Sequence, residues 1–117
     1  MKYPRTPHLP YSKGATRDDR MLSGNWFNYY KNQEIIITEK LDGSNTCFTK
    51  ENVFARSHGA PCRNPWDYNL WNSNDGLYWK IQSKIGPYEL IFGENLYGEH
   101  SICYNKLPSY WFMFACY

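Results

Sequence analysis

The chain has 117 residues, of which 42% are hydrophobic and 21% are charged, and its formal net charge is +2. This length fits one small domain that can bury a core without disulfides or metal ions. No apolar run approaches the ~20 residues of a membrane-spanning helix, so we expect no transmembrane segment. Prolines at positions 4, 7 and 10 leave no apolar centre for a signal peptide. We therefore expect a cytoplasmic protein whose cysteines are reduced thiols.

The positive charge is concentrated at the N-terminus. The first twenty residues carry a local net charge of +3, which leaves −1 for residues 21–117. This distribution does not indicate a basic surface across the whole chain, as nucleic-acid binders usually have. Residues 1–24 are rich in proline, glycine, serine and charge, and we expect them to form an irregular leader. Such a leader is either solvated or in contact with a phosphate backbone.

Short runs of β-branched and aromatic residues predict a sheet. The run Ile35-Ile36-Ile37-Thr38 is typical of a strand that is buried on both faces. Residues 45–49 and 53–57 are predicted to form a hairpin around the polar link 50–52. The two further predicted strands are residues 88–92 and the aromatic stretch 110–117.

Helices are expected between roughly Pro65 and Lys84. Asn64 supplies a capping side chain, and Pro65 suits the first position of a helix. A second helical stretch is expected from Asp75, and Gly86-Pro87 would end it. Its apolar stripe consists of Leu77, Ile81 and Ile85. The predicted fold class is therefore α+β, an antiparallel-rich sheet with helices packed on it.

The segment that carries chemistry is Lys40-Leu41-Asp42-Gly43, directly after the first predicted strand. The preceding isoleucines would place Lys40 at the mouth of a hydrophobic interior, where desolvation favours the neutral, nucleophilic amine. Gly43 would permit a sharp turn. The structural alternative is an exposed lysine and aspartate at a strand end before a glycine turn.

This K-x-D-G segment resembles the signature of the covalent nucleotidyltransferases, which comprise RNA ligases, DNA ligases and mRNA-capping enzymes. Its extended form, from Glu39 to Asn45, looks most like that of the ATP-dependent RNA ligases. Three later segments resemble further family motifs in order and approximate spacing, namely residues 54–59, 92–98 and 111–114. Residues 3–10 and 99–104 also look like a bacterial and phage branch of RNA ligases.

The resemblance implies an ATP-grasp-like nucleotidyltransferase domain, the adenylation domain of a ligase. It implies ATP and Mg²⁺ as cofactors, and RNA ends with a 5′-phosphate and a 3′-hydroxyl as partners. Lys40 would attack the α-phosphate of ATP to form lysyl-AMP and release pyrophosphate. The AMP would pass to the RNA 5′-phosphate, and the 3′-hydroxyl would then displace it to seal the strand.

The resemblance also implies roles for individual residues. Asn45 would orient the phosphate, and Asp42 would shape the turn that presents Lys40. Glu39 would read the adenine edge. The remaining ligands would be Arg56 for a flanking phosphate, Glu94 for ribose and Phe114 for stacking on the base.

Structural alternatives stay open for three of these residues. Glu94 is alternatively an acid in a glycine-rich turn, and Arg56 is alternatively a surface residue of a strand. Phe112 and Phe114 have the same strand parity, so spacing does not choose between them. A core phenylalanine is a further alternative for either position.

A different constellation, His58 with Cys62 and His100 with Cys103, has the number and softness of zinc ligands. Both spacings are loose, and neither contains a paired Cys-x-x-Cys. Buried thiols and surface histidines are the favoured interpretation, and we assign no metal ligand from the sequence.

The sequence departs from the family pattern in two places. Ala115 follows Phe114, where the family usually has an aspartate. Two later family segments, with a metal-organising glutamate and triphosphate-binding lysines, do not follow the aromatic stretch. We therefore expect residues 1–117 to be the N-terminal portion of an adenylation domain, with its C-terminal part absent. Without a complementing half, such a chain would lack most of the electrostatic stabilisation for reaction at Lys40.

The sequence thus predicts an ATP-dependent RNA ligase, or the N-terminal fragment of one. A DNA ligase or a capping-type guanylyltransferase is an enzymatic alternative, because both share the K-x-D-G signature. A catalytically incompetent half-domain that binds nucleotide or RNA without turnover is the non-enzymatic alternative.

Overall fold

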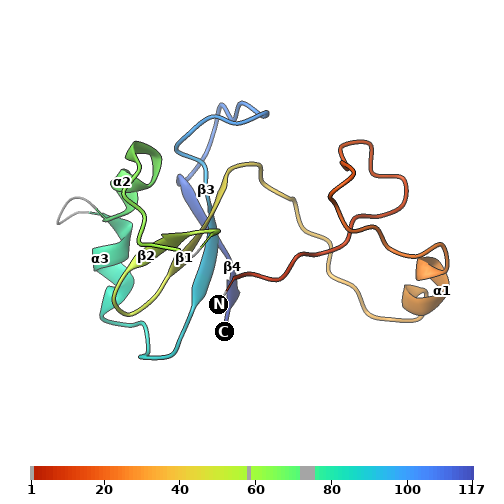
Figure 1. Cartoon of the computed structure of the whole chain (residues 1–117), viewed down its shortest axis with the longest axis horizontal. Helices are drawn as coiled ribbons and strands as arrows, with labels where there is room; N and C mark the ends of the chain where they lie inside the picture. Colours follow the sequence, from red (N-terminus) through yellow and green to blue (C-terminus); the bar gives the residue numbers. More distant parts are fainter. Residues whose placement is uncertain (1, 58, 72–75) are drawn as a thin grey trace. The chain divides into compact units, whose positions relative to one another are not determined.

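The computed structural model describes residues 2–57, 59–71 and 76–117 (Figure 1). It divides into two compact units. The N-terminal unit is Pro4–Glu39, and the sheet unit comprises residues 1–3 together with Lys40–Tyr117.

The sheet unit is built on a four-stranded antiparallel sheet with the strand order β2-β1-β3-β4. The strands are β1 (Ser44–Phe48), β2 (Val53–Ala55), β3 (Ile91–Asn95) and β4 (Trp111–Cys116). The predicted hairpin is confirmed, since β1 and β2 pair antiparallel with Phe48 opposite Val53. The predicted final strand is also confirmed, and it pairs with β3 at the edge of the sheet.

Two short helices, α2 (Pro65–Trp71) and α3 (Leu77–Gln82), lie against one face of this sheet (Figure 1). The predicted start of α2 is confirmed, because the Asn64 Oδ1 atom accepts the Asp67 N–H at 2.9 Å. The predicted start of the second helix at Asp75 lies outside the described residues. None of the helices in the described ranges is long and apolar enough to cross a membrane.

The core lies between the helices and the face of the sheet that carries Phe48 and Trp111. Their rings stack with centroids 4.5 Å apart and an interplanar angle of 7°. The Tyr78 ring of α3 meets Phe48 edge-on at 5.6 Å. The Trp111 indole N–H donates to the Thr46 hydroxyl at 2.7 Å, so its polar atom is satisfied inside the core. We call this side of the sheet the core face.

Gly93 of β3 makes room for Trp111. A Cβ atom at this position would lie 2.2 Å from the Trp111 ring. That distance is far below van der Waals contact, so any side chain larger than hydrogen would displace the indole. The glycine of the Phe92-Gly93-Glu94 segment is therefore explained by packing on the core face.

The predicted strand at Ile35–Thr38 is wrong. These residues belong to the N-terminal unit and lie outside its helix α1 (Trp26–Tyr30) and outside every strand. Ile35, Ile36 and Ile37 are 62%, 89% and 87% exposed. Their β-branched side chains favour an extended backbone, but burial requires a paired sheet, and this segment pairs with none.

The strand expected at residues 88–92 is displaced towards the C-terminus. Gly86 donates its backbone N–H to the Glu89 carboxylate at 2.7 Å, which forms a turn, and Tyr88 is 94% exposed. β3 therefore begins only at Ile91 and runs through Asn95. As a result, Glu94 lies within a strand and not in a turn after it.

The four cysteines are free, and Cys47 and Cys62 are buried. Burial raises the pKa of the Cys47 thiol to about 11. Burial, followed by the charge of the neighbouring Asp67, raises the pKa of Cys62 to about 12. Both side chains therefore stay neutral at physiological pH and act as small apolar groups.

Replacing Gly93 with alanine should destabilise the sheet unit, because the new methyl group overlaps the Trp111 ring. We expect a loss of about 1–3 kcal/mol in the free energy of unfolding, measured by denaturant titration. Gly14→Ala is the matched control, because a Cβ atom there has nothing within 4 Å. Equal stability of the two variants would contradict the packing of Trp111 on Gly93.

Candidate active site

The strand register brings three of the candidate residues into one row across the sheet. Asn45 of β1 is paired with Glu94 of β3, and Glu94 is paired with Phe112 of β4. Directly paired residues project from the same face of a sheet, so these three side chains share one face. Since side chains alternate along a strand, this face is opposite to the one that carries Phe48 and Trp111. We call Asn45, Glu94 and Phe112 the site row.

Each side chain of the site row is half-buried. Among the described residues, the Asn45 Oδ1 atom is buried and has no hydrogen-bond partner. A buried polar atom without a partner costs about 1–3 kcal/mol, and native structures seldom keep one. The Asn45 carbonyl is therefore an acceptor that a bound ligand with an O–H or N–H group could satisfy.

The K-x-D-G segment is attached to the site row through Gly43. The Gly43 N–H donates to the Glu94 Oε1 atom at 3.0 Å. A Cβ atom on Gly43 would lie 2.4 Å from the Asn95 carbonyl oxygen and 2.6 Å from the Leu96 side chain. The glycine is thus required by the close approach of two backbone segments, which differs from the sharp turn expected from sequence.

Asp42 is held by a segment that follows β3. Its backbone N–H donates to the Tyr104 hydroxyl at 2.8 Å, and its Oδ2 atom accepts the Ser101 N–H at 3.1 Å. The Ser101 hydroxyl also donates to Oδ2. The hydroxyl and backbone hydrogen bonds from Ser101 hold the pKa of Asp42 below its ordinary value, because they favour the charged carboxylate.

A further contact joins the same two segments at Ser44. The Ser44 Oγ atom lies 3.1 Å from the His100 Nε2 atom, within hydrogen-bond distance. From the sequence, residues 99–104 only resemble a branch of RNA ligases, and apart from the disfavoured zinc interpretation of His100 and Cys103 no role is predicted for them. The available signal for these contacts was a group of polar side chains after Glu94, namely His100, Ser101 and Tyr104. Their partners, Asp42 and Ser44, lie about sixty residues away in the chain, so the sequence did not reveal the contacts.

Lys40 is exposed, and the expected hydrophobic mouth around it is not formed. The expectation failed because the isoleucines before Lys40 are themselves exposed. Burial therefore does not activate this amine in the structure. Its positive charge is a minor cause of the lowered pKa of Asp42, two residues further along the chain.

Phe114 occupies a different position from Phe112. The pairing of β3 with β4 shifts between Phe92 and Gly93, and Phe114 falls at this irregularity without a partner in register. Its ring meets Tyr3 edge-on at 5.0 Å, and it is 45% exposed. Of the two phenylalanines that sequence spacing could not separate, Phe112 is the one aligned with Glu94.

Arg56 and Glu39 are both exposed. Arg56 directly follows Ala55, which pairs with Thr46, so it lies at the end of β2 near the level of Asn45. Glu39 is the last residue of the N-terminal unit. The phosphate contact of Arg56 and the adenine contact of Glu39 stay predictions.

Asn95, adjacent to Glu94, supports the site from the core face. Its side-chain amide donates to the Trp66 carbonyl at 2.9 Å and to the Asp67 Oδ1 atom at 3.0 Å. Asn95 and Asp67 are 1% and 2% exposed, so the bond between their side chains is buried. They fix the end of β3 to the start of α2, a support that sequence reasoning did not detect.

The residues considered for zinc fall in different environments. His58 lies outside the described residues, and Cys62 is buried in the core beside Asp67. The Cys103 Sγ atom lies 3.7 Å from the Asn105 side-chain oxygen. Within the described ranges, no group of three or more His, Cys, Asp or Glu side chains could hold a metal ion.

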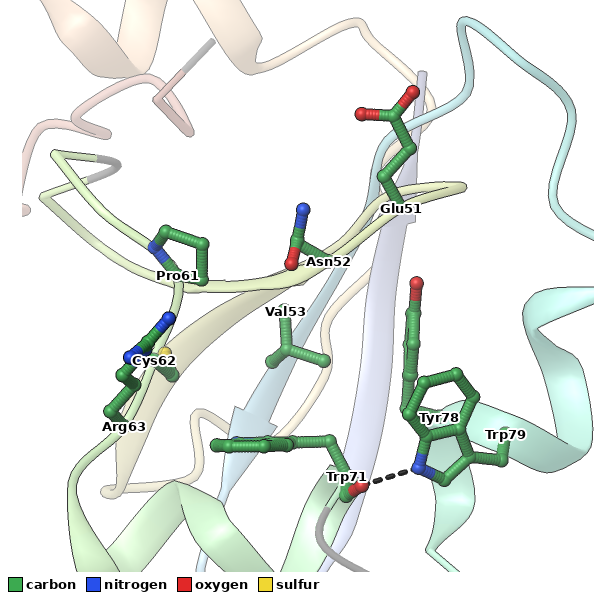
Figure 2. Close-up of a pocket in the computed structure, with 9 residues that line it drawn as sticks. All are labelled: Glu51, Asn52, Val53, Pro61, Cys62, Arg63, Trp71, Tyr78 and Trp79. Carbon is green, nitrogen blue, oxygen red and sulfur yellow. Dashed lines mark hydrogen bonds between the residues drawn. The ribbon is translucent and has the colours of Figure 1, made fainter. Parts of the chain in front are cut away.

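A pocket of about 550 Å³ opens on the core face (Figure 2). Val53 and the Trp71 ring face each other across it, and the Trp79 indole N–H donates to the Trp71 carbonyl. Its described lining residues include none of the candidate catalytic or nucleotide-binding residues. The site row and this pocket are therefore separate features of the sheet.

The fold and the site row define an α+β protein with a site on one face of an antiparallel sheet and a lysine-bearing segment that leads into the inner strand β1. The RNA ligase family model matches residues 33–117, which is most of the chain. The chain belongs to the RNA ligase family. Searches of the curated proteins and of the solved structures found no match.

Replacing Ser101 with alanine should raise the pKa of Asp42 towards its ordinary value of about 3.9, because a hydrogen bond to the charged carboxylate is lost. In the wild-type protein, this carboxylate stabilises the fold above its unfolded-state pKa. That stabilisation is lost as the pH falls through its lower folded-state pKa. NMR titration of the Asp42 carboxyl carbon measures the shift.

Ser101→Thr is the matched control for this titration, since it keeps the hydroxyl and should keep the low pKa. A pKa that is the same in wild-type and Ser101→Ala protein would show that the Ser101 hydroxyl does not bind the Asp42 carboxylate.

Proposed function

We propose that this chain acts as an ATP-dependent RNA ligase that forms lysyl-AMP at Lys40. The observation that carries the proposal is the hydrogen bond from Gly43 to Glu94, which attaches the K-x-D-G turn to the site row. This bond brings the turn that bears the candidate nucleophile to the polar face of the sheet. Membership of the RNA ligase family supports the same chemistry.

The proposed reaction proceeds in three displacements at phosphorus. The neutral Lys40 amine forms a P–N bond to the α-phosphate as the α–β anhydride breaks and pyrophosphate leaves. An oxygen of the RNA 5′-phosphate then displaces the lysine and takes the AMP. Finally, a 3′-hydroxyl attacks the RNA 5′-phosphate, loses its proton, and releases AMP as the strand is sealed.

The site row supplies groups of the types that a nucleoside requires. Glu94 would accept a hydrogen bond from a ribose hydroxyl through its carboxylate, while its Oε1 atom also holds Gly43. The buried Asn45 carbonyl would accept a hydrogen bond from the bound nucleotide, and the Asn45 amide would orient the phosphate. Arg56 and Glu39 would contact a flanking phosphate and the adenine edge, respectively.

Phe112 is the ring that we propose for stacking on the base. Its support is the pairing with Glu94, because the two side chains project from one face of adjacent strands. Phe114, the ring favoured by sequence, packs on Tyr3 instead. Stacking of a base on an aromatic side chain is worth on the order of 1–3 kcal/mol.

Mg²⁺ enters the proposal as the counter-ion of the nucleotide phosphates, where it would offset negative charge during attack. The described residues do not form a metal cluster of their own.

Incubating the protein with α-labelled ATP and Mg²⁺ should add one AMP, which intact mass measurement detects and peptide mapping places on Lys40. Lys40→Arg should abolish the label because arginine, although it keeps the positive charge, is not a nucleophile at neutral pH. Lys84→Ala is the control and should be labelled like the wild type. Label that survives Lys40→Arg would contradict the proposed nucleophile.

Three further experiments distinguish the RNA ligase from a capping-type enzyme, from a DNA ligase and from a chain that needs a complementing half. GTP as the preferred donor would indicate a capping-type enzyme, and sealing of nicked DNA over nicked RNA would indicate a DNA ligase. Label that appears only when the C-terminal half of an RNA-ligase adenylation domain is added would support the expected complementing half.

A binding-only half-domain is the second candidate function. The exposure of Lys40 favours it, because a nucleotide could bind at the site row without contacting this amine. Nucleotide binding that survives Lys40→Ala, without any label on the wild type under these conditions, would establish that function.

Phe112→Ala should weaken binding of a non-hydrolysable ATP analogue by roughly 5- to 150-fold, as expected for the loss of one stacking ring. Phe114→Ala is the matched variant and should bind within about twofold of the wild type, because its ring packs on Tyr3. Isothermal titration calorimetry measures both. The opposite ranking would assign the stacking role to Phe114.

A further inference from the structure

The segment between β3 and β4 folds back onto the turn that carries Lys40. We call residues 98–104 the clamp segment. Three of its side chains contact the turn and the start of β1: Ser101 and Tyr104 bind Asp42, and His100 meets Ser44. Each contact joins residues at least 56 positions apart in sequence.

We propose that Ser101 and Tyr104 are positioning residues that hold the Lys40 turn in place for attack on the nucleotide. This inference rests on the function proposed above. Neither residue needs to touch the nucleotide, since each acts through Asp42.

The two residues restrain different parts of Asp42. Tyr104 accepts the backbone N–H, and Ser101 donates to the carboxylate through both its hydroxyl and its own N–H. Asp42 precedes β1, which begins at Ser44, so its N–H is not part of the strand ladder. The clamp segment thus gives this backbone group a partner that the sheet does not provide.

The N-terminal side of the Lys40 turn has no support from a helix or a strand in the part of the chain that the structure describes. Residues 35–40 are exposed and lie outside helices and strands. Beyond Lys40, Gly43 is anchored by Glu94, and Asp42 is anchored by the clamp segment. Attack on phosphorus requires the amine in line with the leaving group, and a displacement of about 1 Å can slow such a reaction about a hundredfold.

A purely structural role for these bonds predicts a different outcome from a positioning role. Loss of a structural contact would lower stability without changing the rate of the chemical step in molecules that remain folded. Loss of a positioning contact lowers the rate at saturating nucleotide and leaves nucleotide affinity nearly unchanged. The two roles are therefore separated by measuring rate and half-saturation independently.

The experiment measures single-turnover labelling by α-labelled ATP as a function of ATP concentration, under the condition that labels the wild-type chain. Tyr104→Phe removes the acceptor for the Asp42 N–H and should lower the maximal rate at least about tenfold. The ATP concentration at half-maximal rate should stay within about twofold of that of the wild type. Tyr110→Phe, which removes a tyrosine hydroxyl six residues further along the chain, should leave both values unchanged.

Ser101 gives a second, independent pair of variants. Ser101→Ala should slow labelling, and Ser101→Thr, which restores a hydroxyl, should recover most of the rate. If Tyr104→Phe does not fold, this pair decides the question. Amide hydrogen exchange supplies a readout without turnover, since the Asp42 N–H should exchange faster in Tyr104→Phe than in the wild type.

Wild-type labelling rates in both Tyr104→Phe and Ser101→Ala would overturn the positioning role and leave the proposed function intact. A raised half-saturating ATP concentration with an unchanged maximal rate would also overturn it, because it would make these residues nucleotide ligands. A wild-type chain without label under any condition would overturn the proposed function and, with it, the role of the clamp segment.

Discussion

The pairing of β1 with β3 is the constraint on which the rest of the structure depends. Five consecutive residue pairs, from Ser44 opposite Asn95 to Phe48 opposite Ile91, set a single register between two distant parts of the chain. A slip of one residue would turn every side chain to the other face. This register simultaneously aligns Phe48 with the core and Asn45 with Glu94. A change of register would therefore disrupt both the core packing and the candidate site.

Two glycines of the recognised motifs, Gly43 and Gly93, support this pairing because they leave space for neighbouring groups, and not because they adopt unusual backbone angles. Gly93 leaves room for the Trp111 indole on the core face, and Gly43 lets the K-x-D-G turn approach the backbone of Asn95. The glycine of one motif thus abuts the strand of another. Motifs that are separate in sequence form one packed unit, in which the buried amide of Asn95 also fixes the first turn of α2.

Several features could be predicted from the sequence because their causes are local. The Asn64-Pro65 pair marked the start of a helix, and the hairpin around residues 50–52 followed from two short strand patterns and a polar link. The prediction of a buried strand at Ile35–Thr38 failed because its cause is not local. β-branched residues set the local backbone preference, whereas burial depends on a partner strand that local sequence does not specify. The expected activation of Lys40 by desolvation depended on that strand and failed with it.

The sequence by itself determined the α+β class, the RNA ligase family and the identity of most candidate residues, because these depend on residue types and their order along the chain. Only the tertiary structure decided which residues meet. Phe112 aligns with Glu94 because β4 changes register near Gly93, and strand parity alone does not reveal such a shift. Tyr104 reaches Asp42 because a loop folds back across 62 positions, a contact with no local signature. The register of β4 on β3 and the contact of this loop with Asp42 both depend on residues far apart in the chain. They are therefore defined only when the whole sheet has formed.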